Sequence, residues 1–169
     1  MVAASLKKTF PCCRGDPLTP LHTAADLSLA VNTVKPAKAL IVYLESDGSV
    51  ASAVGGKYAD GWITAQVKAF GQYTVMLDTT GPVITNVDLR ADMRGRKGFE
   101  LRISDNLSGI SSWRGTLDGD WILLEYEPKT KTLSHAFDKH SGGAGKKEFK
   151  LIVVDERGNT SSYRSEFTH

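Results

Sequence analysis

The feature that most constrains the fold of this chain is an alternation of apolar and polar residues, broken at short intervals by glycine and other turn-forming residues. A period of two places alternate side chains on opposite faces of a β-strand, whereas an amphipathic helix needs a period of 3.6. The alternation is clear at 27–32 and 99–103, and 39–44 is a short apolar run rich in β-forming residues. The pattern predicts an all-β protein in which no segment requires a helix.

The turn segment at 78–82, Asp-Thr-Thr-Gly-Pro, is the best candidate for a domain boundary, because Pro82 cannot donate a hydrogen bond to a sheet ladder. Residues 1–24 show no sustained period and are predicted to be an irregular lead-in. We expect a first β-sandwich-like module over 25–80 and a second module over 81–169. A chain of 169 residues has room for two small modules of this kind.

The second module is predicted to be an immunoglobulin-like β-sandwich, because about seven short strands and their turn signals follow one another at the spacing typical of that fold. Asp118-Gly119 indicates a tight hairpin between strands at 113–117 and 121–126, since both turn positions need a positive φ. No cysteine pair is available to staple the two sheets, so packing must hold them together. The aromatic residues expected in this core are Phe99, Trp113, Trp121, Tyr126 and Phe149.

The charge distribution argues against a polyanionic partner. The net charge is +2, from 21 basic and 19 acidic residues spread along the chain, so we expect no nucleic-acid binding. No apolar stretch approaches the roughly 18 residues of a membrane-spanning helix. Residues 1–10 contain no apolar signal region, so an export signal, if there is one, is expected outside this sequence.

Few residues suggest chemistry. Cys12 and Cys13 are adjacent, a placement that suits neither a mutual disulfide nor a C-x-x-C site, and they are predicted to lie in a loop. The acidic residues around the 118–119 turn and along 125–127 are explained by a solvated face, and the glycine-rich segment 142–145 by a loop. The basic segment 90–97 is expected to be an exposed hairpin tip, with contact to anionic wall polymers as the alternative.

Two segments of the sequence contain an aspartate a few residues before a turn glycine: Asp105 before Gly109, and Asp155 before Gly158. Aspartate side chains in such loops commonly accept hydrogen bonds from their own backbone, and glycine supplies the positive φ, so turn capping is the favoured interpretation. The alternative is a calcium site, since calcium prefers oxygen ligands and strand ends of a sandwich can gather at one pole. Asp105 and Asp155 are the first candidates for that site.

The phrases at 104–110, 118–119 and 154–160 resemble the strand ends of bacterial immunoglobulin-like domains on cell-surface proteins. Four segments that come earlier in the chain resemble the region before such a domain at the C-terminal end of some lysostaphin-like zinc peptidases. These four segments are Gly55-Gly56-Lys57-Tyr58, Gly61-Trp62, Phe70-Gly71-Gln72-Tyr73 and Asp78-Thr79-Thr80-Gly81-Pro82.

The catalytic domain of that peptidase family binds zinc through an H-x-x-x-D element and a later H-x-H element. His22 and Asp26 have the first spacing but lack the flanking glycines, and none of His135, His140 and His169 forms an H-x-H. Because a catalytic zinc needs three rigidly held protein ligands, we expect no zinc site. The resemblance, which covers roughly 38–169, therefore implies the accessory tail of the family without its catalytic domain.

The sequence accordingly predicts a non-catalytic accessory or spacer module of a bacterial cell-envelope protein, which positions a wall peptidase or binds peptidoglycan or another wall polymer. The alternative is a protein–protein adhesion or assembly module of the cell surface, with an envelope protein as partner. In both cases the expected location is the periplasm or the cell surface. No catalytic, cofactor-binding or metal-binding residue is assigned.

Overall fold

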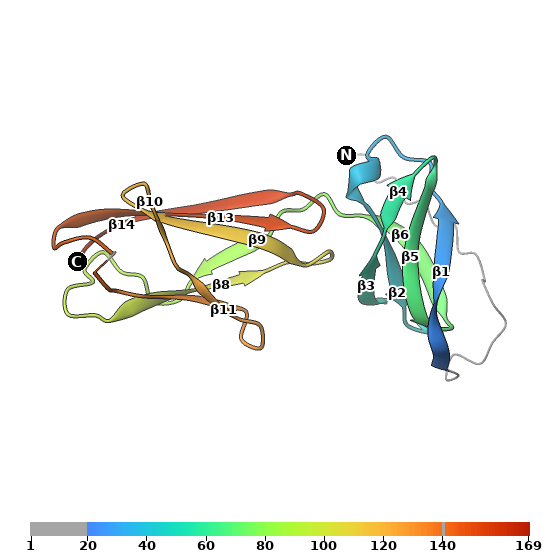
Figure 1. Ribbon diagram of the computed structural model, residues 1–169, viewed down its shortest axis with the longest axis horizontal. Coiled ribbons are helices and arrows are strands. Elements are labelled where there is room, and N and C mark those ends of the chain that lie inside the picture. The colour runs from blue at the N-terminus through green and yellow to red at the C-terminus, as the bar shows by residue number, and fades with distance from the viewer. Residues whose placement is uncertain (1–19, 140) are drawn as a thin grey trace. The chain divides into compact units, whose positions relative to one another are not determined.

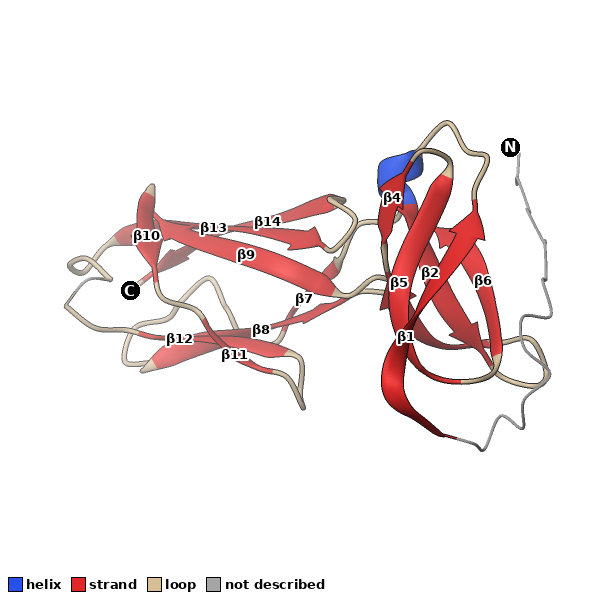
Figure 2. Ribbon diagram, turned by 45° about the vertical axis from the view of Figure 1, so that its right-hand side comes forward, coloured by secondary structure: helices blue, strands red, loops and turns tan. Residues whose placement is uncertain are grey.

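A computed structural model describes residues 20–139 and 141–169. It contains 60% strand and 2% helix in four antiparallel sheets, which confirms the prediction of an all-β protein with two β-sandwich modules. Figure 2 shows the strands in red and, among the described residues, a single short helix in blue. No helix in the described part of the chain is long and apolar enough to cross a membrane.

The chain forms two compact units, divided between Thr79 and Thr80. In unit 1, a sheet with the order β1-β5-β4 and a sheet with the order β3-β2-β6 make up the sandwich. Both are antiparallel. The elements of unit 1 are β1 (Pro20–Ala30), η1 (Pro36–Lys38), β2 (Ala39–Leu44), β3 (Val50–Gly55), β4 (Lys57–Ala59), β5 (Trp62–Ala69) and β6 (Gln72–Leu77). Their buried side chains include Leu29, Ala39, Ile41, Ile63 and Ala65.

Unit 1 differs from the sequence prediction at two places. Strand β1 begins at Pro20, inside the segment assigned to the lead-in, because pairing with β5 extends to Pro20 opposite Ala69. Strands β3 and β4 were not predicted. Both lie at sheet edges and are largely exposed, so neither shows the apolar alternation that a buried face imposes.

Unit 2 is a sandwich of two four-stranded sheets, with the orders β11-β12-β8-β7 and β10-β9-β13-β14. Figure 1 shows β9, β13 and β14 on one side of unit 2 and β8 and β11 on the other. This arrangement matches the strand order of constant-type immunoglobulin domains with β10 added at one edge. The strands are β7 (Val83–Asn86), β8 (Gly98–Ser104), β9 (Ile110–Leu117), β10 (Asp120–Ile122), β11 (Glu125–Glu127), β12 (Thr132–Ala136), β13 (Lys146–Asp155) and β14 (Thr160–Thr168).

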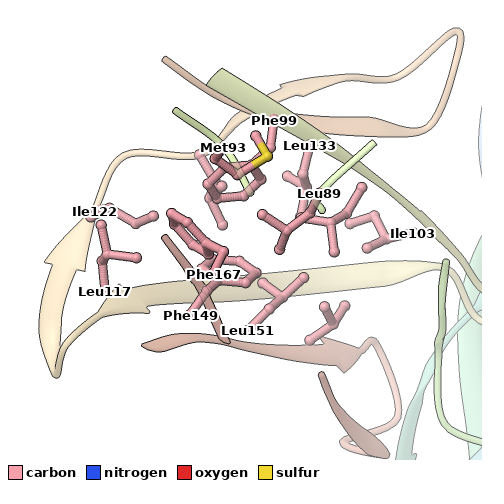
Figure 3. Packing of buried hydrophobic residues seen from close by; sticks show 13 residues of the cluster. Leu89, Met93, Phe99, Ile103, Leu117, Ile122, Leu133, Phe149, Leu151 and Phe167 are labelled. Atoms are coloured by element: carbon pink, nitrogen blue, oxygen red, sulfur yellow. The ribbon is translucent and has the colours of Figure 1, made fainter. Parts of the chain in front are cut away.

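The core of unit 2 forms around aromatic side chains (Figure 3). Phe99 packs against Phe149, with ring centroids 4.9 Å apart, and against Phe167 at 6.1 Å. Both Phe99 and Phe149 are fully buried, as predicted. Trp113 and Tyr126 are partly buried against this core. The prediction for Trp121 is wrong, because this side chain is 56% exposed.

Candidate interaction face

The turn between β9 and β10 is the tight hairpin that the sequence predicts. Leu117 lies opposite Asp120, which leaves Asp118 and Gly119 as the two turn residues. Their φ angles are 52° and 94°, so both turn positions are left-handed, as a type I′ turn requires. The turn is fastened to β13, since Asp118 Oδ1 accepts a hydrogen bond from the Glu148 backbone N–H at 2.8 Å.

The electrostatics of Asp118 follow from this fastening. The hydrogen bond from the Glu148 backbone, together with the ammonium group of Lys147 at 3.1 Å from Oδ2, lowers the pKa of the Asp118 carboxyl below its usual value. The charged form of Asp118 is therefore the form that holds the hairpin to β13. This fixes the position of β10, which pairs only with β9.

The predicted single strand over 121–126 is wrong. Strand β10 ends at Ile122 in one sheet, and β11 begins at Glu125 in the other sheet, so the chain crosses between the sheets at Leu123 and Leu124. The apolar run of residues 121–124 hides this crossing in the sequence, because apolar residues on both faces give no alternation to interpret. We refer to residues 122–125 as the crossover.

The crossover is held by the side chain and the backbone of Leu124. The Leu124 side chain is buried beside Gly115, where an added Cβ would lie 2.5 Å from Leu124 Cδ1. Trp113 donates a hydrogen bond from Nε1 to the Leu124 carbonyl at 3.2 Å, and its ring packs on Tyr126 at 5.0 Å. Leu124 thus points into the core, and its neighbours in sequence point outward.

Two large apolar side chains are left exposed by this geometry. Trp121 is 56% exposed and Leu123 is 57% exposed, while Ile122 between them is buried. Cross-strand pairing places Trp121 beside Thr116 of β9, Thr116 beside Lys150 of β13, and Lys150 beside Arg164 of β14. Side chains in such a row lie about 5 Å from their neighbours. We call this row, together with the exposed Leu123 that follows the end of β10, the Trp121 face; it comprises Thr116, Trp121, Leu123, Lys150 and Arg164.

The Trp121 face combines aromatic and cationic groups. Arg164 is paired with Glu148, with Nε 2.7 Å from Oε1, and both side chains remain largely exposed. Among the described residues, no carboxylate lies within ion-pair distance of Lys150. Tryptophan and arginine are the residue types that most often dominate the binding energy of protein interfaces. The face therefore combines the residue types that favour binding of a partner.

The aspartates predicted to gather at one pole do so. Carboxylate oxygens of Asp105 and Asp155 lie within 4.8 Å of each other. Asp105 Oδ2 accepts hydrogen bonds from the backbone N–H groups of Leu107 and Gly109, both at 2.9 Å. Asp155 Oδ1 accepts two more, from Arg157 and Asn159, both at 2.8 Å, and Asn159 Nδ2 reaches Oδ2. These bonds confirm the turn-capping interpretation.

The glycines of these two loops have the predicted conformation, with φ of 90° at Gly109 and 72° at Gly158. The loops are also joined directly, since the Glu156 backbone N–H donates to the Gly109 carbonyl at 3.0 Å. Asp105 Oδ1 is buried and accepts no hydrogen bond within the described part of the chain. The turn-capping hydrogen bonds therefore account for the aspartate and the glycine in both segments.

In the described part of the chain, the residues with the H-x-x-x-D spacing do not lie close enough to share a zinc ion. His22 and Asp26 both lie on β1 and are exposed, and four residues of strand span about 13 Å, too far for shared coordination. His135 is buried on β12 in unit 2. His169 stacks on Phe137 at 4.0 Å. The positions of His140, Cys12 and Cys13 lie outside the described residues.

The basic segment at 90–97 is not a simple exposed hairpin tip. It belongs to the connection from β7 to β8, in which Met93 is fully buried and donates its backbone N–H to the Thr168 carbonyl at 2.8 Å. Arg94 pairs with Asp92 at 2.6 Å, and the hydrogen bond from Arg94 lowers the pKa of Asp92 to about 2. Arg96 pairs with Asp88. Partner carboxylates thus neutralise two of the cations that were considered for wall binding.

Comparisons with known proteins give little information. Residues 13–78 match the model of the Zu5-like domain, a match that contains the described part of unit 1 up to Asp78. No curated protein matches. Among solved structures, crystal structures of BcpA, the major pilin subunit of Bacillus cereus, and of a single-substitution variant are each 10% identical, with a TM-score of 0.21. Each comparison covers 86% of this chain and 69% of the pilin chain, and a TM-score this low supports no argument.

Proposed function

We propose that this chain is a non-catalytic protein-binding module of a bacterial cell envelope, used in adhesion or assembly at the cell surface, and that the Trp121 face is its binding surface. The observation that carries the proposal is the exposure of Trp121 and Leu123 on either side of the buried Ile122, with Trp121 on the edge strand β10 at the end of a cross-strand row that continues through Thr116 to Lys150 and Arg164. Exposed apolar side chains rimmed by polar residues mark interaction sites.

An enzymatic role is not proposed. Within the described residues, His135 and the Asp105–Asp155 pair engage in internal hydrogen bonds, and His22 belongs to no group of three side chains that could hold a metal ion. A catalytic site needs a nucleophile, a base or a metal aimed at an accessible reacting atom. The Trp121 face offers contact area and charge, which serve recognition.

The resemblance of the 55–82 phrases to the tail of zinc peptidases keeps a second candidate open, an accessory module that binds peptidoglycan for a wall peptidase. The two functions differ in the chemistry of the partner. A protein partner on the cell is destroyed by mild surface proteolysis, whereas a peptidoglycan partner survives it and is also present in purified sacculi.

The purified chain is therefore added to intact cells of its source bacterium, to protease-shaved cells and to purified sacculi, and bound protein is quantified. We expect saturable binding to intact cells that shaving abolishes. Trp121→Ala should weaken it by about 30-fold, which corresponds to about 2 kcal/mol for a residue that dominates an interface.

The matched control is Trp62→Ala, because Trp62 is also a strand tryptophan and is 51% exposed, but lies in unit 1. This variant should bind cells as the parent chain does. Equal binding to sacculi and shaved cells would instead support the peptidoglycan function. Equal losses in both tryptophan variants would show that the Trp121 face is not the binding surface.

A further inference from the structure

The crossover that presents the Trp121 face is attached to a buried histidine of the opposite sheet. His135 Nδ1 lies 2.9 Å from the Leu123 carbonyl oxygen. Because a carbonyl oxygen can only accept, Nδ1 must carry a proton and donate. His135 is 6% exposed and lies on β12, so this bond ties a core residue of one sheet to the backbone of the exposed Leu123.

The other ring nitrogen holds the imidazole in place. His135 Nε2 lies 3.0 Å from Ser141 Oγ, and Ser141 is 2% exposed. Ser141 Oγ in turn accepts a hydrogen bond from the Asp138 backbone N–H at 2.9 Å and lies 3.1 Å from Asp138 Oδ1. Phe99 and Phe137 pack on the ring at centroid distances of 5.3 Å and 5.6 Å. The ring cannot turn without losing both hydrogen bonds.

Apart from the buried side chains of Ile122 and Leu124, few other contacts hold the crossover. Leu123 and Leu124 are the two residues between β10 and β11, and no backbone–backbone hydrogen bond outside the strands involves either of them in the described part of the chain. Their carbonyls are instead bound by two side chains, His135 for Leu123 and Trp113 for Leu124. The direction in which Leu123 points therefore depends on these two donors as well as on the buried side chains on either side of it.

We propose that His135 is the positioning residue of the Trp121 face: its Nδ1–H binds the Leu123 carbonyl and fixes the crossover, so that Leu123 is held outward in one conformation beside the end of β10. An exposed side chain held in one conformation loses less conformational entropy on binding than a mobile one, and preorganisation of this kind increases affinity. The statement about affinity rests on the proposed function, whereas the statement about the conformation of the crossover stands on the geometry alone.

Two substitutions of His135 distinguish the roles of its two ring nitrogens. In His135→Asn the side-chain amide reaches the position of Nδ1, and in His135→Gln it reaches the position of Nε2. We expect the amides of 121–125 to exchange with deuterium at least about tenfold faster in His135→Gln than in His135→Asn. Exchange at Leu151 and Val153 in the centre of β13 reports global stability and corrects for it. A purely structural role would change both groups of amides together.

Wild-type protein provides a test that does not depend on the variants folding. The 15N spectrum of His135 must show a proton on Nδ1, and a ring with Nδ1 unprotonated overturns the proposal. Equal exchange of the 121–125 amides in the two variants, after correction, overturns it as well.

Cell binding is measured for the same two variants. Faster exchange in His135→Gln with no binding of the parent chain to cells would refute the proposed function and leave the positioning role intact. Binding that needs Trp121 but is equal in His135→Asn and His135→Gln would refute the link from His135 to affinity.

Discussion

Replacing Trp113 and Trp121 by phenylalanine, one at a time, tests the central structural distinction between two tryptophans on neighbouring strands. Trp113→Phe removes the Nε1–H that binds the Leu124 carbonyl, and Leu124 is only 5% exposed, so water cannot easily replace the donor. A buried carbonyl left without a partner costs about 1–3 kcal/mol. The packing on Tyr126 is largely kept, because a phenyl ring still covers it.

Trp121→Phe removes surface that solvent already reaches, and a change of this kind usually stays within about 0.5 kcal/mol. A middle value of about 2 kcal/mol for Trp113→Phe corresponds to a fall in Tm of roughly 8–16 °C for a module of this size. For Trp121→Phe the fall should stay below about 4 °C. The two variants therefore differ by more than calorimetric error.

The assay is hydrogen exchange at Leu151 and Val153, which lie in the fully buried centre of β13 and report the opening of unit 2 itself. Differential scanning calorimetry of the same proteins gives the shift in Tm. A Trp121→Phe variant that loses as much stability as Trp113→Phe would refute the reasoning, because it would mean that Trp121 is a core residue. A Trp113→Phe variant of parental stability would refute the role of its hydrogen bond.

Four further outcomes are expected. Gly98→Ala should destabilise unit 2 strongly, measured as the urea midpoint, because the new Cβ would overlap the backbone carbonyl of His135. The pKa of Asp118 is lowered in the folded state, so its contribution to the free energy of unfolding is complete above the unfolded-state pKa and is lost as the pH falls through the folded-state pKa. The difference in unfolding free energy between the parent chain and Asp118→Asn should therefore shrink on acidification. A difference that stays constant with pH would contradict this role of Asp118. Asp155→Ala should cost roughly 1.5–3 kcal/mol per lost backbone hydrogen bond before relaxation, seen as faster exchange at Arg157 and Asn159. Calcium or EDTA should leave the Tm unchanged, and a rise of several degrees with calcium would show that the aspartate pole binds the ion.

The sequence predicts the buried part of this protein well, because burial imposes a pattern on residues. The alternation around Phe99 and the apolar run at Phe149 both mark strands whose inner face is the core. The Asp118-Gly119 turn is predicted with its φ signs, since few residue pairs tolerate that conformation. The capping role of Asp105 and Asp155 follows in the same way from local backbone chemistry.

The exposed part is predicted poorly for the converse reason. Strand β3 lies at an edge with most of its residues in solvent, so nothing in its composition separates it from a loop. Trp121 was placed in the core because its size favours burial on average, yet the register of β10 turns it outward and Ile122 inward. Only pairing with β9, fixed by the 118–119 turn, decides between the two faces.

The candidate site could not be predicted from the sequence, because the sequence does not show which face of residues 121–124 is buried. In the run Trp121-Ile122-Leu123-Leu124 each residue is apolar, so either alternate pair could fill the core. Gly115 favours one solution, because its missing side chain leaves room for Leu124, and the buried donors on Trp113 and His135 bind the carbonyls of that same arrangement. These three residues lie outside the apolar run and favour the same arrangement as the pairing of β10 with β9. Core contacts that direct exposed side chains in this way preorganise them, which is the property that the proposed binding face requires.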